Sequence, residues 1–100
     1  MMCGGTTDAK DATEEIQAIC EQIREDLEGK AGKKFSSYKA KQYKSQVVAG
    51  TNFFVKIEVE SDDGSEHIHA RIFRPLPGGG DVKLHSFQAG KKADEEIAYF

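Results

Sequence analysis

Two stretches in the middle of the chain alternate apolar and polar residues, one over positions 51–60 and one over 67–72. A period of two is typical of a strand with one buried face, so the pattern predicts two strands joined at the turn signal Asp62-Asp63-Gly64. The apolar positions are Phe53, Val55, Ile57, Val59, Ile68, Ala70 and Ile72. The interposed His67, His69 and Arg71 are expected on the opposite, solvated side of the sheet.

Further strands are expected before and after this pair. The run Phe35–Ser45 predicts a preceding strand, and Val82 and Leu84 open a later one. Between them, Pro75–Asp81 contains Leu76-Pro77 and three glycines, which cannot form the interior of a strand and therefore predict a loop. Ile97–Phe100 is expected to add a short terminal piece.

A helical pattern precedes the strands. Asp11 is a suitable N-cap, and Glu14 three residues later completes a capping box. Gly29 and Gly32 are expected to end the helix. The apolar stripe is Ile16, Ile19, Cys20, Ile23 and Leu27. Met1–Lys10 is small, polar and aperiodic, and is expected to be a mobile trunk. The prediction is a single α+β domain over residues 1–100, with four to five antiparallel strands around one long helix.

The connection Gln46–Gly50 differs from an ordinary hairpin turn. Gly50 followed by Thr51-Asn52 is turn chemistry, because glycine tolerates a positive φ. Hairpin tips are usually polar, yet this one carries Val47, Val48 and Ala49. Apolar residues at a tip indicate a surface for a partner. Alternatively, the two valines end a strand and point inward, and the local pattern does not decide between these interpretations.

Composition limits the classes of function. The chain has 100 residues, of which 38% are hydrophobic and 31% charged, and its net charge is −3. No window approaches the ~20 apolar residues of a membrane span. Lys39, Lys41 and Lys44 interleave with tyrosines, but the acidic balance disfavours binding that depends on phosphate neutralisation. Neither a nucleic acid nor a membrane is therefore expected as a partner.

Cysteine and histidine usage predicts no cofactor, metal or catalytic centre. Cys3 and Cys20 do not form a disulfide framework, which suits a reducing compartment, the cytoplasm and also the nucleus, and no secretory signal is expected. Cys20 is expected to be an inert core thiol, and Cys3 an exposed one that could link two copies on oxidation. His67, His69 and His85 lack a fourth zinc ligand. No nucleophile, base and oxyanion site converge, so an enzyme is not expected.

The motif Gln46-Val47-Val48-Ala49-Gly50 resembles the signature of the cystatin superfamily of cysteine-protease inhibitors. Other segments are similar in the same order along the chain, and together they resemble the intracellular single-domain branch, the stefins. These segments are Met1-Met2-Cys3-Gly4, the helix, Lys33-Lys34-Phe35, Leu76-Pro77 and Ile97–Phe100.

The resemblance implies a reversible, tight-binding competitive inhibitor of papain-like cysteine proteases, with cathepsins of the L, S, H and B type as partners. It implies a three-part wedge formed by the trunk, the first hairpin loop and a second loop. The implied protease-binding residues are Gly4, Gln46, Val47, Val48, Ala49, Gly50, Leu76 and Pro77. Gly78-Gly79-Gly80 is expected to loosen the second loop, which leaves open a binding module that has lost inhibition. The family also suggests a monomer that can form a domain-swapped dimer.

Overall fold

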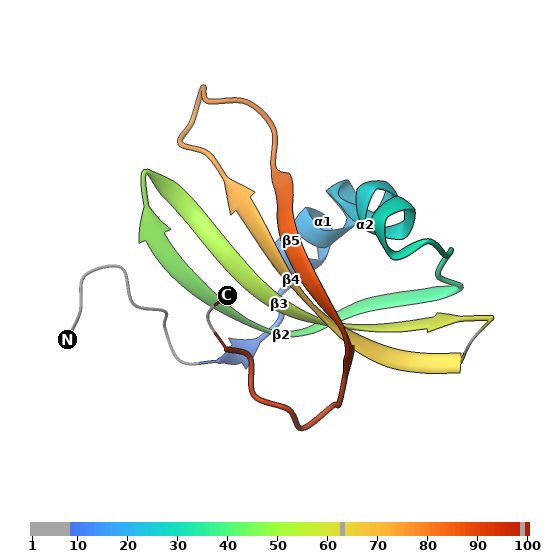
Figure 1. Cartoon of the computed structure of the whole chain (residues 1–100). Helices are drawn as coiled ribbons and strands as arrows, with labels where there is room; N and C mark the ends of the chain where they lie inside the picture. Colours follow the sequence, from blue (N-terminus) through green and yellow to red (C-terminus); the bar gives the residue numbers. More distant parts are fainter. Residues whose placement is uncertain (1–8, 63, 99) are drawn as a thin grey trace.

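An antiparallel sheet carries two consecutive helical segments on one face in the computed structural model, which describes residues 9–62, 64–98 and 100 (Figure 1). The strands lie in the order in which they follow along the chain, so each pairs with its predecessor. They are β1 Lys10–Asp11, β2 Ser37–Val48, β3 Gly50–Ser61, β4 Gly64–Arg74 and β5 Lys83–Lys91. The helices are α1 Glu14–Gln22 and α2 Arg24–Ala31. This arrangement confirms the predicted α+β fold class.

The helices pack their apolar stripe on the sheet, as the periodicity predicted. Every member of the stripe is at most 3% exposed, and the same cluster contains the inward-facing residues of β3 and β4. Tyr38 of β2 fastens the two layers, because its hydroxyl donates to the carbonyl oxygen of Cys20 at 2.7 Å. Burial of this stripe, at about 25 cal/mol per Å² of apolar surface, is the main stabilising term for the helices.

The expected single long helix is interrupted at Ile23. The Ile23 amide donates to the carbonyl oxygen of Cys20, three residues back, at 3.2 Å, which is a tighter turn than that of an α-helix. Ile23 is 2% exposed, so the apolar stripe continues through the interruption. The helix is therefore two segments that share one buried face.

The start of α1 differs from the predicted capping box. Thr13 is the N-cap, and its hydroxyl accepts a hydrogen bond from the Ile16 amide at 3.3 Å. Asp11 lies in β1, opposite Gln42 of β2. The prediction of Asp11 as the cap was wrong because pairing with the sheet edge takes this residue away from the helix.

The end of α2 agrees with one of the two predicted stops. Gly32 adopts the left-handed conformation with φ 75°, and its amide donates to the carbonyl oxygen of Glu28 at 2.9 Å. Gly29 lies inside α2, so the prediction that it ends the helix was wrong. No helix in the described parts of the chain is long and apolar enough to cross a membrane.

The middle of the second face of the sheet, at Phe54, Lys56 and His69, is buried rather than solvated. After β5 the chain turns back across this face, and we call residues 92–98 and 100 the C-terminal strap (Figure 1). Ile97 of the strap is 1% exposed, and the Phe54 and Phe100 rings lie edge to face at 5.7 Å between centroids. Lys56, at 3% exposure, donates from Nζ to the carbonyl oxygens of Ala93 and Glu95, each at 2.6 Å. The expected single buried face was wrong because a segment distant in sequence covers the other one.

The ends of the chain also depart from the expected elements. Lys10 pairs with Tyr43 in β1, and residues 1–8 of the expected trunk lie outside the described residues. The expected short terminal piece at Ile97–Phe100 contains no strand in its described residues and belongs to the C-terminal strap. The loop between β4 and β5 lies where Pro75–Asp81 predicted it. The β3–β4 turn lies at the other end of the sheet, between the paired residues Ser61 and Gly64.

Candidate binding edge at the loop end of the sheet

Exposed large apolar side chains gather at one end of the sheet. Among the described residues these are Val47 at 75% exposure, Val48 at 44% and Leu76 at 59%. The β2–β3 and β4–β5 connections turn at this same end, so the two loops form one edge, called the loop edge below (Figure 1). The inward alternative for the two valines is therefore excluded, and the interpretation as a partner surface is favoured.

The first loop is tighter than the sequence suggested. β2 runs to Val48 and β3 begins at Gly50, so Ala49 alone separates the paired residues. Thr51 and Asn52 lie within β3 rather than in the turn. Val47 and Val48 are thus the last residues of β2 that pair with β3, and this pairing restricts their backbone conformation.

Gly50 is required by both conformation and space. Its φ of 121° is one that residues with a side chain rarely adopt. A Cβ atom built on Gly50 would lie 2.6 Å from the carbonyl oxygen of Arg74 and 2.8 Å from Cζ of Phe73. The end of β4 therefore lies directly against the first loop, and this contact sets the first loop relative to the second.

Gln46 has a different role from the exposed valines. It is 7% exposed, and its Oε1 accepts a hydrogen bond from Nδ2 of Asn52 at 2.9 Å. Asn52, also 7% exposed, lies opposite Gln46 across the hairpin. The sequence pattern placed Gln46 in the loop and Asn52 in its turn, and it carried no signal that the two amides pair and are buried.

The second loop closes on a β-turn. The Gly79 amide donates to the carbonyl oxygen of Leu76 at 2.8 Å, with Pro77 and Gly78 between them. Gly78 has a φ of 87°, as the third position of a type II turn requires, and proline is common at the second. A Cβ atom on Gly79 would lie 3.0 Å from the Leu76 oxygen. Two of the three glycines thus serve the turn that presents Leu76.

Arg74 fastens the base of the second loop to the helix. Its guanidinium carbon lies 5.0 Å from the centroid of the Phe53 ring, and Nη1 lies 3.1 Å from Oε2 of Glu15. An open hollow of about 490 Å³ separates the second loop from the end of α1, with Gln22, Arg74 and Val82 on its walls. Its lining has no convergent catalytic groups.

The described start of the chain, β1, points toward the loop edge. β1 runs antiparallel to β2, so its amino-terminal end faces the end of the sheet where β2 reaches Val48. Gly4 lies outside the described residues. The direction of β1 is thus the one described feature that is relevant to the trunk as the expected third part of the wedge.

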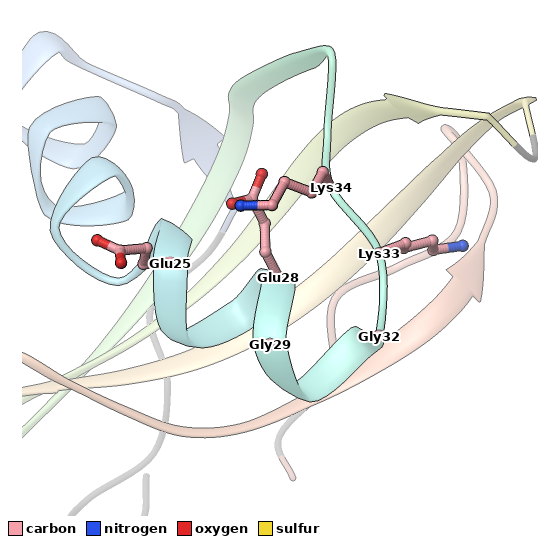
Figure 2. Close-up of a pocket in the computed structure, with 6 residues that line it drawn as sticks. All are labelled: Glu25, Glu28, Gly29, Gly32, Lys33 and Lys34. Carbon is pink, nitrogen blue, oxygen red and sulfur yellow. The ribbon is translucent and has the colours of Figure 1, made fainter.

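A second hollow, of about 390 Å³, lies where α2 meets the chain leading into β2 (Figure 2). Figure 2 shows the Lys34 side chain directed toward the Glu28 carboxylate, while Lys33 points away. The Phe35 amide donates to Glu28 at 2.9 Å and lowers the pKa of this carboxyl, with Arg24 contributing further. Arg24, Glu28 and Phe35 bond to one another and tie α2 to the chain leading into β2, so this corner is structural.

Neither a metal centre nor a reactive thiol is present in the described residues. They contain no group of three or more histidine, cysteine or acidic side chains suited to a metal ion. His69 is 1% exposed, and His85 is exposed on β5. Cys20 is fully buried, and burial raises the pKa of its thiol to about 12, which disfavours the thiolate. Cys3 lies outside the described residues.

Comparison with known proteins agrees with this fold. Residues 4–94 match the cystatin domain family. The chain is 45% identical over 101 residues to cystatin-B of Oplegnathus fasciatus, covering all of this chain and 98% of the relative. It is equally identical to cystatin-B of Bos taurus over the whole of both chains. Stefin-C of Bos taurus is 45% identical over 98 residues, 97% of this chain and 94% of the relative. The chain therefore belongs to the cystatin family, with relatives of the cystatin B type as the motifs predicted.

Proposed function

We propose that the protein is a reversible, tight-binding competitive inhibitor of papain-like cysteine proteases, including cathepsins of the L, S, H and B type. The coarser part of this proposal, a protein that inhibits cysteine proteases and is not an enzyme, follows from membership of the cystatin family. The finer part is the mechanism, in which the loop edge and the trunk fill the active-site cleft as a three-part wedge.

The observation that carries the mechanism is the gathering of Val47, Val48 and Leu76 on two adjacent loops. Fully burying an aliphatic side chain of this size is worth about 1.5–3 kcal/mol relative to leaving it exposed. Elsewhere in the described chain such side chains are buried or half-buried, so the apolar surface is concentrated where a cleft could cover it. A footprint of the usual protease–inhibitor size, roughly 1,600 Å², could accommodate this edge.

Preorganisation supports tight binding. The first loop ends in a paired ladder, and the second closes on a hydrogen-bonded turn with Pro77 inside it. Loops that are already shaped lose less conformational entropy on docking, which raises affinity for the same contact area. Inhibition then needs no chemical step by the inhibitor, only occupation of the cleft.

Gly4 is proposed as the third contact, in the trunk. Its support is the resemblance of Met1-Met2-Cys3-Gly4 to the family pattern and the direction of β1 toward the loop edge. We place the inhibitor in the cytoplasm and also the nucleus, where a reducing medium would keep Cys3 and Cys20 as thiols.

The test is titration of the protein into active papain while hydrolysis of a fluorogenic peptide is followed. We expect stoichiometric, competitive inhibition with the inhibitor recovered uncleaved. Val48→Asp should raise the inhibition constant at least about 100-fold, because it places an unpaired charge against an apolar wall. Ala89→Asp, exposed on β5, makes the same charge change and should leave inhibition unaltered.

Two outcomes would contradict parts of the proposal. Full inhibition by a folded Val48→Asp variant would remove the first loop from the wedge. An unchanged inhibition constant for a variant that starts at Gly5 would remove the trunk. If the folded wild-type monomer does not inhibit papain at all, the chain is a binding module that retains only the scaffold.

A further inference from the structure

We infer that Asn52 is a positioning residue for the first loop, acting through Gln46 rather than by touching a protease. This inference rests on the proposed function, since it concerns how the loop edge is held ready for the cleft. Asn52 belongs to β3 and lies outside the signature motif Gln46–Gly50. Its role follows from three observations: its place in the ladder, its buried amide bond and its neighbour on β4.

The strand pairing places Asn52 close to the β2–β3 turn. Gln46 pairs with Asn52, Val47 with Thr51 and Val48 with Gly50, so two residue pairs separate Asn52 from the turn. Residues opposite each other in an antiparallel pair have side chains on the same face and in contact range. The Gln46–Asn52 pair is thus the last buried cross-strand contact before the exposed valines.

The bond between these two side chains is selective for register. Nδ2 of Asn52 donates to Oε1 of Gln46 at 2.9 Å, and each residue is 7% exposed. An apolar pair would tolerate small displacements, whereas a buried amide loses a hydrogen bond when its partner moves. A slip of β2 by one residue would also turn Gln46 to the other face of the sheet, away from Asn52. The amide pair therefore favours one alignment of the strand ends that carry the valines.

Asn52 also joins the first loop to the strand that leads into the second. It pairs on its other side with Phe73 of β4, and the Phe73 ring lies against Gly50. The row Gln46, Asn52, Phe73 thus crosses three strands beneath the first loop. On the opposite face Arg74 covers Phe53, so the tip is held from both sides. Within this row, Asn52 is the central member.

Losing the Asn52 donor should reduce the fraction of molecules with a binding-competent loop. The apparent dissociation constant rises in inverse proportion to that fraction. We expect Asn52→Leu to weaken inhibition of papain about 10-fold, mainly by slowing association. Val47 and Val48 are unchanged in this variant, so the loss would report their placement and not their contact area.

Two variants at position 52 separate positioning from stability, and both leave Gln46 unchanged because it is one of the implied protease-binding residues. Asn52→Leu removes the donor, whereas Asn52→Gln keeps a side-chain amide opposite Gln46. We expect Asn52→Gln to retain tight inhibition and Asn52→Leu to weaken it about 10-fold, and urea denaturation measures the stability of each variant separately. If Asn52→Leu does not fold, Asn52→Ala removes the same donor with a smaller side chain and takes its place in the comparison.

Equal, wild-type inhibition by folded Asn52→Leu and Asn52→Gln would overturn the inference, because the donor at position 52 would then have no effect on inhibition. The free proteins supply a second readout by NMR. We expect the amides of residues 47–50 to give one resonance each in Asn52→Gln and broadened or multiple resonances in Asn52→Leu. Identical spectra would likewise overturn it. Failure of the wild type to inhibit papain would instead remove the proposed function, and the spectra would still test Asn52.

Discussion

The two faces of the sheet are held in different ways, although alternate residues of the same strand supply both. Toward the helices, β3 presents Val55, Ile57 and Val59, which lie in one continuous apolar cluster. Toward the C-terminal strap it presents Phe54 and Lys56, and the strap covers them with the Phe100 ring and with backbone carbonyl groups. The helix side depends on volume and apolar area, whereas the strap side depends on directed hydrogen bonds as well.

This difference indicates which substitutions should destabilise the whole domain and which should loosen only one segment. Apolar contacts on the helix side connect α1, α2 and four strands, so a cavity there should lower the stability of the whole domain. The strap contacts the sheet through a few fixed points, of which the Lys56 ammonium is the most deeply buried charge. Strap substitutions should therefore open one segment before they unfold the protein.

The largest expected effect is on the helix side. Ile57→Ala removes fully buried methyl groups from the core and should lower the free energy of unfolding by about 3–4 kcal/mol. Urea denaturation followed by circular dichroism measures this change. The matched control is Val47→Ala, exposed on the loop edge, which should change stability by less than about 0.5 kcal/mol. Similar losses in the two variants would contradict the assignment of the core.

Next in size is a pH effect on the strap side. Burial, together with the positive charge of Lys56, lowers the pKa of His69 from 6.5 to about 4. Lys91 and His67 also lower this pKa, and Glu95 of the strap opposes them. Below pH 6.5 the unfolded chain binds a proton that the folded protein resists, so stability should fall as the pH drops from about 6.5 to 4. The total loss is on the order of 2–3 kcal/mol.

The check is urea denaturation of wild type and His69→Gln across that pH range. The variant should lose most of this pH dependence, whereas His85→Gln, at an exposed position of β5, should retain it. If the His69→Gln curve paralleled that of the wild type, His69 would not be the group that titrates.

A smaller and more local effect is expected for Lys56→Met. The variant keeps the apolar stem but removes the ammonium that donates to Ala93 and Glu95. We expect faster amide hydrogen exchange over residues 92–98, with a global loss of about 1–2 kcal/mol, because two carbonyl oxygens lose their donor. Exchange measured by mass spectrometry locates the effect. Unchanged exchange in the strap would contradict the proposed fixing role of Lys56.

The smallest effect is expected on the outer surface of α2. Lys30 lies 3.2 Å from Asp26, but about half of each side chain is exposed. Exposed ion pairs of this kind contribute at most about 0.5 kcal/mol. Lys30→Ala should therefore shift the urea midpoint only slightly, and Lys30→Arg should not shift it. A loss above about 1 kcal/mol would show that the outer helix face contributes more than its contacts indicate.

The helix side could be predicted from the sequence because its signal is local. The spacing of Ile16, Ile19 and Leu27 defines a stripe without reference to any other part of the chain. Asp11 was misassigned because its strand partner, Gln42, is 31 positions away, beyond the reach of a capping pattern. The break at Ile23 leaves the apolar spacing intact, so the pattern carries no sign of it.

The strap side could not be predicted for a related reason. Lys56 and His69 are polar residues of the kind usually found on a solvated face, and they are buried because the strap returns across the sheet. At the loop edge, the exposure of Val47 and Leu76 agreed with a partner surface, but the burial of Gln46 depends on Asn52 across the hairpin. Local pattern thus identifies what a segment exposes more readily than what a distant segment will cover.

The unbroken length of β3 has a practical consequence for attaching the protein to a surface or a dye. Its 12 residues run from Gly50 at the loop edge to Ser61 at the opposite end, roughly 36 Å away. Phe100 is packed against Phe54, and the trunk is a proposed contact, so both termini are poor anchoring points. An anchor at Asp62, in the β3–β4 turn, would leave the loop edge facing the medium, as an immobilised sensor for proteases requires.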